Sequence, residues 1–137
     1  MDSIEIGNNV HIGDNAFIRG EGGLCIGDNT HISRNLLLYT MNHDYEGELL
    51  PYDSNMRYRP VTIGKNVWVG MNVTILPGAV IGNGAIIGAG AVVAGNVEEA
   101  GIYGACLAKK IKSRNLDHYK SLEETGKYGG VNGFPVS

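Results

Sequence analysis

Aliphatic side chains recur at every sixth position along most of this chain. Twelve such positions follow one another, with a slip of two residues after the third and a long interruption after the sixth: Ile6, Ile12, Ile18, Ile26, Ile32, Leu38, Ile63, Val69, Ile75, Ile81, Ile87 and Val93. Most of them are preceded, two positions earlier, by a small or β-branched residue: Val10, Ala16, Thr30, Val67, Val73, Ala79, Ala85 and Ala91. Because alternate residues of a strand lie on one face, this spacing predicts short strands that direct both residues inward.

The positions between these strands favour corners. Glycine follows the aliphatic residue in seven of the twelve repeats, and Asn or Asp often comes next, as in Gly7-Asn8 and Gly27-Asp28. Glycine and Asn adopt positive φ at low cost, and three repeats of strand and corner make one coil of about 18 residues. The pattern therefore predicts an all-β fold, a prism of stacked coils with parallel strands. An antiparallel sandwich is the alternative, but its strands recur every 8 to 12 residues or so, which the shorter step excludes.

Two segments depart from the repeat. Residues 44–60 keep no register and are rich in Tyr, Asp, Glu and Arg, so we expect an irregular loop that protrudes from the coils and carries function. Beyond residue 104, Asn115 or Ser113 can cap a short helix that Gly126 ends. We expect this helix to cover the strand edges of the last coil, before a flexible tail. The predicted domains are residues 1–112, the coils with their loop, and residues 113–137, the helix and tail.

Composition narrows the functional classes. A chain of 137 residues with a formal net charge of -3 fits one domain and argues against a nucleic-acid surface. No apolar stretch approaches the roughly 18 residues of a membrane span, and the start of the chain lacks the pattern of a signal peptide, so we expect a cytoplasmic protein. Cys25 and Cys106 are too few for a disulfide framework and lack the spacing of a zinc site.

Three segments resemble the hexapeptide-repeat acyltransferases: residues 63–70 (IGKNVWVG), 75–82 (ILPGAVIG) and 87–93 (IGAGAVV). The closest branch contains sugar O-acetyltransferases, such as the galactoside and maltose enzymes, and acetyltransferases of surface-polysaccharide synthesis. The resemblance covers roughly residues 4–112. It implies a left-handed parallel β-helix that forms homotrimers, with acetyl-CoA as co-substrate bound between subunits and without a metal. It also implies a sugar, nucleotide-sugar or polysaccharide-precursor acceptor, acetylated at a hydroxyl or an amine.

The resemblance places the general base at His43, at the foot of the loop. An imidazole suits this role, because near neutral pH it can take the proton of a hydroxyl or amine that attacks a thioester carbon. His43 also falls in an outward slot of the register, one position before the next aliphatic residue is due, and is therefore not expected in the core.

Acceptor-binding residues are predicted at Glu21, Asn42, Tyr58 and Arg59. Glu21 matches a position where the galactoside enzyme has an Asp that binds sugar hydroxyls, and a carboxylate accepts two such hydrogen bonds well. The alternative for Glu21 is a purely structural corner at the two-residue slip. The Tyr and Arg side chains of the loop suit sugar contacts, and equally suit packing against a neighbouring subunit.

The resemblance assigns coenzyme A binding to Trp68, Gly70, Met71, Ala89, Lys109 and Lys112. Trp68, the single tryptophan, takes an outward slot, where it must pack against a ligand or a neighbouring subunit. Other positions depart from the family. Ala94-Gly95-Asn96 lacks a Lys that many relatives use for phosphate, Glu98-Glu99 replaces a Pro-Pro pair, and Cys106-Leu107 replaces an Asn-Pro or similar pair. These departures weaken the expected nucleotide site and favour, as an alternative function, an inactive or scaffold trimer.

Two further pairs could carry chemistry. Cys25 and His43 are one coil apart and are expected to stack on one face, which would permit a Cys-His nucleophile. His11 and His31 are one coil plus the slip apart and are also expected to stack. A trimeric carbonic-anhydrase-like zinc enzyme is thus a third alternative, although the histidine spacing does not match that family.

Overall fold

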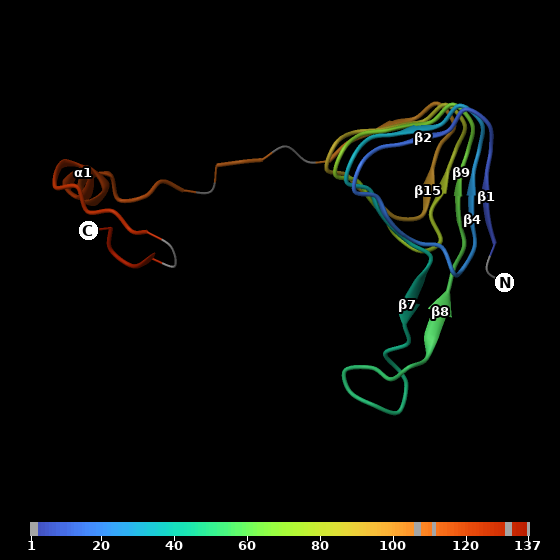
Figure 1. Ribbon diagram of the computed structural model, residues 1–137, viewed down its shortest axis with the longest axis horizontal. Helices are drawn as coiled ribbons and strands as arrows, with labels where there is room; N and C mark the ends of the chain where they lie inside the picture. The colour runs from blue at the N-terminus through green and yellow to red at the C-terminus, as the bar shows by residue number, and fades with distance from the viewer. Residues whose placement is uncertain (1–2, 106–107, 111, 131–132, 137) are drawn as a thin grey trace. The chain divides into compact units, whose positions relative to one another are not determined.

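The six-residue repeats build a parallel β-solenoid of about five coils, a computed structural model of which is drawn in Figure 1. Sheet A comprises β1 (Ile4–Ile6), β4 (Leu24–Ile26), β9 (Val61–Ile63), β12 (Val80–Ile81) and β15 (Asn96–Val97). Sheet B comprises β2 (His11–Ile12), β5 (His31–Ile32), β10 (Trp68–Val69), β13 (Ile86–Ile87) and β16 (Ile102–Tyr103). Sheet C comprises β3 (Phe17–Arg19), β6 (Leu37–Tyr39), β11 (Thr74–Ile75) and β14 (Val92–Val93). The all-β parallel fold predicted from the repeat is confirmed.

The structure describes residues 3–105, 108–110, 112–130 and 133–136. The chain divides into two compact units, Met1–Cys106 and Leu107–Ser137. The domain boundary expected after residue 112 stays a prediction. Among the described helical residues, no stretch is long and apolar enough to cross a membrane.

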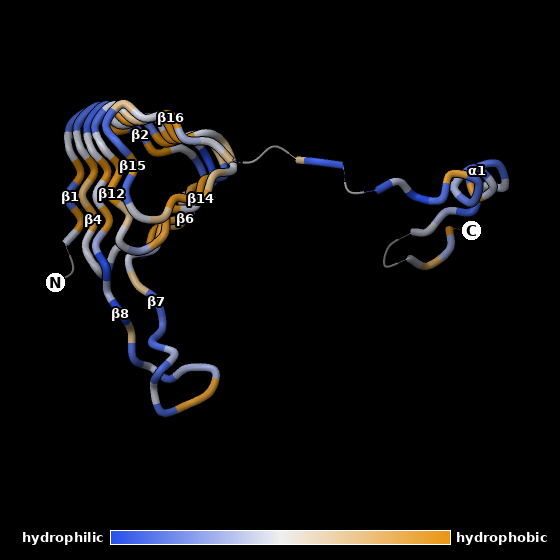
Figure 2. Tube along the Cα trace, turned by 180° about the vertical axis from the view of Figure 1, so that it is seen from behind, coloured by the Kyte–Doolittle hydropathy of each residue, from blue (hydrophilic) through white to orange (hydrophobic). Residues whose placement is uncertain are grey.

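The aliphatic positions stack into columns inside the solenoid. Ile26, for example, lies beside Ile6 on one neighbouring strand and beside Ile63 on the other. Figure 2 shows these hydrophobic positions recurring at the same place in successive coils. Nine of the twelve are buried, namely Ile26, Ile32, Leu38, Ile63, Val69, Ile75, Ile81, Ile87 and Val93. The inward direction that the two-residue alternation predicts for these aliphatic side chains is therefore confirmed.

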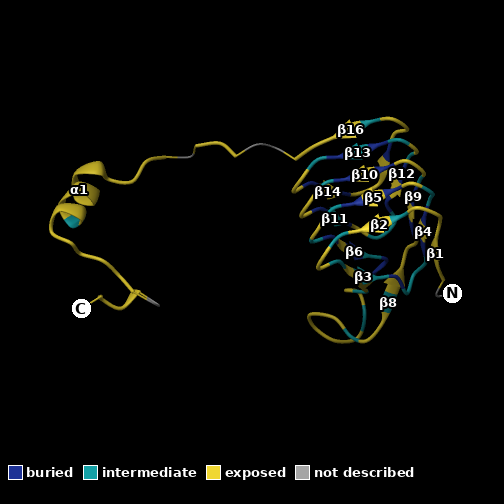
Figure 3. Ribbon diagram, turned by 45° about the horizontal axis from the view of Figure 1, so that its top comes forward, coloured by how far each residue is buried: buried dark blue, intermediate teal, exposed yellow. Residues whose placement is uncertain are grey.

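The first coil is less covered than the rest. Ile6 and Ile12 belong to the inward columns, yet 52% and 38% of their surfaces are exposed, because no described residue forms a further coil beneath them. Figure 3 shows the same contrast between the exposed β2 and the buried positions of the middle strands.

Two kinds of residue make the corners. Asn9, Asn29 and Asn66 hold the positive φ, and their side chains form a ladder in which each amide donates to the next at 3.0 and 3.2 Å. The glycines that precede them serve a different purpose: a Cβ at Gly27 would lie 2.7 Å from the backbone of Gly64 and Lys65 in the next coil. The sequence analysis placed both Gly and Asn at the corners because of positive φ. That reason holds for the asparagines, whereas Gly27 is required by the close approach of the next coil.

The excursion after residue 40 begins and ends as a β-hairpin. β7 (Met41–His43) pairs antiparallel with β8 (Met56–Tyr58), so that His43 lies opposite Met56. The expectation of an irregular loop over residues 44–60 is thus wrong for residues 56–58, where backbone pairing with β7 imposes strand geometry. Figure 1 shows the hairpin leaving the corner between sheets C and A, and the solenoid resumes at β9.

The second unit contains the predicted helix, α1 (Leu116–Glu124). The Asn115 side chain accepts a hydrogen bond from the backbone N–H of His118 at 3.0 Å, and Gly126 has a φ of 65°. The cap and the end of the helix are therefore confirmed, while its covering of the last coil stays a prediction.

Candidate functional site

The hairpin base and the extra corner before β4 border a half-open cavity of about 410 Å³, which we call the Glu21 chamber. Three of the four predicted acceptor-binding residues meet His43 here. The chamber is lined by Arg19, Glu21, Tyr39, Met41, Asn42, His43, Met56 and Tyr58. Segments separated by about 20 residues in sequence thus contribute one site.

Thr40 fixes the two segments to each other. Its buried hydroxyl donates to the Arg19 carbonyl at 2.7 Å and accepts the Gly22 N–H at 2.7 Å. Its carbonyl accepts the Arg59 N–H at 2.7 Å, which closes the base of the hairpin. A Cβ at Gly22 would overlap the Thr40 carbonyl oxygen. The corner that holds Glu21 is therefore tied to the hairpin that holds His43.

Glu21 is paired with an arginine on the preceding strand. The Arg19 Nε donates to Glu21 Oε1 at 2.8 Å. This hydrogen bond, together with the backbone N–H of Glu21, holds the pKa of the Glu21 carboxyl below its usual range. The second oxygen, Oε2, is buried and has no hydrogen-bond partner within the described part of the chain. Glu21 occupies the bulged corner and also lines the chamber, so its structural and functional interpretations are compatible.

A second cavity, of about 530 Å³, also borders the hairpin and is called the Arg59 chamber. Asn42, His43, Tyr45, Tyr52, Arg57, Arg59 and Pro77 line it. Arg59, the fourth predicted acceptor-binding residue, therefore lines a cavity together with His43, but not the cavity that Glu21 lines. His43 and Asn42 line both chambers.

Carboxylates order the loop that connects the two hairpin strands. Asp44 Oδ1 accepts the Glu46 N–H at 3.0 Å and a contact from Arg57 Nη2 at 3.1 Å, and these bonds lower the pKa of Asp44. Asp53 accepts the N–H groups of Glu48 and Asn55 at 2.8 and 2.9 Å, which lowers its pKa as well. The loop that carries Tyr52 is thus held by side-chain hydrogen bonds to its backbone.

A groove of about 220 Å³ runs along the corner between sheets B and C, and we call it the Trp68 groove. It brings together four of the predicted coenzyme A residues. Its lining consists of Ser33, Trp68, Gly70, Met71, Ile86, Ile87, Gly88 and Ala89. Trp68 is directed outward with 58% of its surface exposed, as expected from its slot. None of the described lining residues is charged, so the groove suits a thioester or amide-containing chain better than phosphates.

The remaining nucleotide-binding predictions lie elsewhere. Lys109 and Lys112 belong to the second compact unit, and their contact with phosphates stays a prediction. Cys106 and Leu107 lie outside the described residues. Gly95 occupies a corner with a φ of 71°, where a lysine would be strained.

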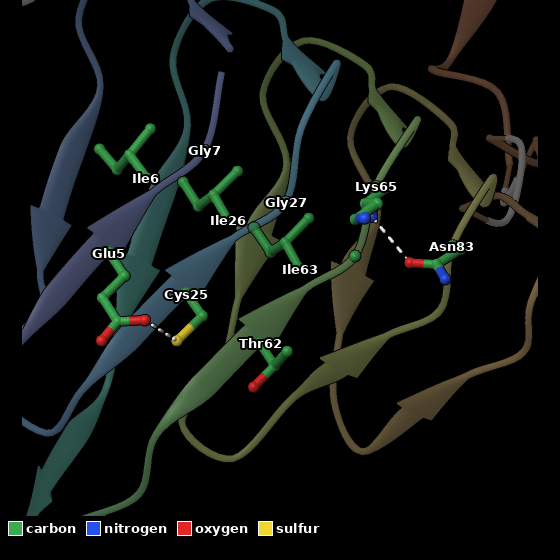
Figure 4. Close-up of a pocket in the computed structure, with 11 residues that line it drawn as sticks. Glu5, Ile6, Gly7, Cys25, Ile26, Gly27, Thr62, Ile63, Lys65 and Asn83 are labelled. Atoms are coloured by element: carbon green, nitrogen blue, oxygen red, sulfur yellow. Dashed lines mark hydrogen bonds between the residues drawn. The ribbon is translucent and has the colours of Figure 1, made fainter. Parts of the chain in front are cut away.

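The expected stack of Cys25 on His43 is wrong. Cys25 lies on the outer side of sheet A between Glu5 and Thr62, and its Sγ is 3.8 Å from Glu5 Oε2 (Figure 4). The chain leaves the solenoid at Thr40, so the strand that follows β4 in sheet A is β9 rather than the segment containing His43. The geometry does not support a Cys-His nucleophile.

The expected stack of His11 on His31 is confirmed. The two residues are register partners, and their ring centroids are 4.4 Å apart. Within the described ranges, no group of three or more His, Cys, Asp or Glu residues is arranged to hold a metal ion. The pair alone therefore does not form the three-ligand centre of a zinc enzyme.

Two site residues escaped the sequence analysis. Arg19 is the last residue of β3, and only its two-residue spacing from Glu21 could have indicated the ion pair. Thr40 stands where the repeat breaks, at a position that sequence periodicity does not describe. Both are apparent only once the corner and the hairpin are seen together.

Two family models match the chain. A model described as bacterial transferase hexapeptide (six repeats) matches residues 60–95, and one described as hexapeptide repeat of succinyl-transferase matches residues 3–40. Together they span more than half of the chain and both solenoid segments that flank the hairpin. No curated protein sequence matches significantly.

Several solved structures are similar to this chain. A hexapeptide-repeat-containing acetyltransferase from Vibrio cholerae, complexed with acetyl coenzyme A, is 26% identical over 80% of this chain and 60% of its own, with a TM-score of 0.67. A variant of the N-acyltransferase AntD from Bacillus cereus, in complex with dTDP-4-amino-4,6-dideoxyglucose and coenzyme A, is 25% identical over 90% of this chain and 71% of its own, with a TM-score of 0.67. This chain thus spans 60% of the length of the Vibrio protein. The polysialic-acid-specific acetyltransferase NeuO, 21% identical over 90% of this chain and 62% of its own, with a TM-score of 0.65, has the same fold.

Proposed function

This chain belongs to the hexapeptide-repeat transferase family, and from that premise we propose that it transfers an acetyl group from acetyl-CoA to a hydroxyl or amine of a sugar or polysaccharide precursor. The observation that carries the proposal is the convergence of His43, Glu21 and Asn42 on one chamber. A base beside a carboxylate and an amide provides the acceptors and donors that a polyhydroxylated substrate needs.

His43 acts as the general base. An unprotonated ring nitrogen accepts the proton of the acceptor's O–H or N–H while the acceptor oxygen or nitrogen bonds to the thioester carbonyl carbon. The carbon–sulfur bond breaks, and the imidazolium returns the proton to the departing thiolate of coenzyme A. The products are the acetylated acceptor and free coenzyme A thiol, and no covalent enzyme intermediate is needed.

Glu21 positions the acceptor. Its pairing with Arg19 keeps it ionised, so it serves as a hydrogen-bond acceptor for a substrate hydroxyl or ammonium group rather than as a second base. Asn42 and Tyr58, from the two hairpin strands, add an amide and a phenol to the same chamber.

The acetyl donor binds along the Trp68 groove, where Gly70, Met71 and Ala89 accommodate its apolar and amide portions. This groove shares no lining residue with either chamber beside His43 and follows a different corner of the solenoid. Donor and base therefore meet when a second copy of the chain brings its Trp68 groove to the hairpin. We propose a homotrimer with one such site at each subunit boundary, as the sequence resemblance also implies.

A screen of acceptors tests this function. Purified protein with acetyl-CoA and a panel of sugars, amino sugars and nucleotide sugars should release free thiol with at least one acceptor. Mass spectrometry of the product then distinguishes O- from N-acetylation. Isothermal titration with acetyl-CoA separates an enzyme from a scaffold: saturable binding that Trp68→Ala weakens supports the proposal, and an absence of binding contradicts it.

A further inference from the structure

His43 lines two chambers of different chemistry. The Glu21 chamber pairs its arginine with a carboxylate, because Arg19 Nε is 2.8 Å from Glu21 Oε1. The Arg59 chamber is lined by two arginines and by no Asp or Glu among the described residues. A substrate whose nucleophile lies at His43 can therefore extend into either chamber, and it meets a charge-balanced environment in the first and a positively charged one in the second.

The positive charge of the second chamber is centred on Arg59. Arg57 is partly compensated, since its Nη2 is 3.1 Å from Asp44 Oδ1 and its guanidinium lies 5.8 Å from the centre of the Tyr45 ring. Arg59 makes no salt bridge with any described residue. Its charge is thus available to a ligand.

Arg59 is also well placed by the fold. Its backbone N–H donates to the Thr40 carbonyl at 2.7 Å, so the residue stands at the base of the hairpin rather than on the loop. Its side chain runs past Gly78: a Cβ on Gly78 would lie 3.4 Å from Arg59 Cδ and 4.0 Å from Arg59 Nη1. Pro77, from the same corner, also lines the chamber. The backbone of Arg59 is fixed by its hydrogen bond to Thr40, and its guanidinium presents a planar set of N–H donors that matches carboxylate and phosphate oxygens.

We propose that the Arg59 chamber binds an anionic group of the acyl acceptor, a phosphate or a carboxylate, and that the preferred substrate is therefore a phosphorylated or acidic sugar. This inference rests on the proposed function of His43, which lines the same chamber. The hydroxylated part of the acceptor lies toward Glu21, the anionic part lies toward Arg59, and the reacting atom lies between them at His43.

Equilibrium binding tests the anionic site independently of turnover. Glucose and galactose are titrated as the free sugar, the 1-phosphate and the uronic acid, with NMR detection of the protein amides. The matched variants are Arg59→Gln, Arg59→Lys and, as a control, Lys65→Gln, which removes an exposed charge at the corner between sheets A and B. We expect at least one anionic form to bind about 10- to 100-fold more tightly than its neutral sugar.

Arg59→Gln should abolish that preference, Arg59→Lys should retain part of it, and Lys65→Gln should retain all of it. The 1-phosphate and the uronic acid distinguish the two sources of negative charge.

Equal affinity for neutral and anionic forms would overturn the proposal, as would an anion preference that survives Arg59→Gln. A change in oligomeric state of Arg59→Gln on light scattering, with preference unchanged, would identify a packing residue instead. Anion binding without acetyl transfer would reject the proposed function and leave the anionic site supported.

Discussion

The imidazole of His43 stacks on the phenol ring of Tyr52, with ring centroids 3.6 Å apart and ring planes 14° apart. Tyr52 belongs to the loop between the hairpin strands, and it covers one face of the proposed base. His43 is exposed, and the lone pair of an imidazole nitrogen lies in the plane of the ring, so a substrate must approach that nitrogen in the ring plane. The loop therefore contributes to the site by fixing the orientation of His43.

Replacing Tyr52 by Ala should lower kcat by about 2- to 10-fold, because an aromatic pair contributes roughly 0.5 to 1.5 kcal/mol beyond its buried area. The KM for acetyl-CoA should change little, since Tyr52 does not line the Trp68 groove. Tyr52→Phe keeps the ring and should keep the rate of the unmodified protein. Steady-state kinetics of the two variants decide the matter: equal losses in both would show that the phenol hydroxyl, and not the stack, is what matters.

Thr40→Val should destabilise the solenoid by about 2 kcal/mol. The valine keeps the shape of the buried Thr40 side chain but leaves the half-buried Gly22 N–H without its acceptor. Thr40→Ser should restore most of the stability, and Thr62→Val, an exposed threonine of β9, is the matched control. Urea unfolding monitored by circular dichroism measures all three. If Thr40→Val is as stable as the control, the hydroxyl does not tie the corner to the hairpin.

Ala100→Gly should stabilise the protein by roughly 0.5 to 1 kcal/mol. Ala100 has a φ of 57°, a conformation that costs a residue with a Cβ about 1 to 2 kcal/mol, partly offset by the greater freedom of glycine in the unfolded chain. The same substitution at Ala94, an exposed alanine without a positive φ, should destabilise by a similar amount. Thermal unfolding of the two variants should therefore shift in opposite directions, and shifts of the same sign would refute the assignment of strain to Ala100.

The order of the loop should depend on pH through Asp53. Its pKa is held below the ordinary 3.8 by the N–H groups of Glu48 and Asn55. A lowered pKa means that the stabilisation is fully present above that ordinary value and is lost as the pH falls through the lower value in the folded protein. The amide protons of Glu48 and Asn55 should shift together in an NMR titration with a midpoint below 3.8. Both shifts should vanish in Asp53→Asn; their persistence there would assign the transition to another group.

Local periodicity explains why the interior of the solenoid was predictable. Ile63 and Val69 face inward because strand geometry alternates side chains regardless of what surrounds the strand, and a six-residue step repeats that geometry in every coil. The corner asparagines were predictable for the same reason, since positive φ is a local property. The resemblance to a known family added His43, Glu21 and Trp68 as candidate residues.

Contacts between segments distant in sequence were not predictable. The departure of the chain at Thr40 removed His43 from the sheet that contains Cys25, so a spacing of one coil no longer meant stacking. The contact of Thr40 with the corner at Gly22 and the Arg59 chamber depend on how the hairpin closes against the solenoid, and neither leaves a periodic signal. The strand over residues 56–58 was missed because its order comes from pairing with β7 rather than from its own pattern.

The most direct test of the account is the initial rate of acetyl transfer in His43→Ala, measured as free thiol released from acetyl-CoA with the best acceptor from the screen. The variant should retain the circular dichroism spectrum and oligomeric state of the unmodified protein, because His43 is exposed and outside the core. Its rate should fall by about 10² to 10⁴, the usual contribution of a general base. His118→Ala, which removes an exposed histidine of α1, should react at the unmodified rate. A folded His43→Ala protein with unchanged turnover would contradict the assignment of His43 as the base.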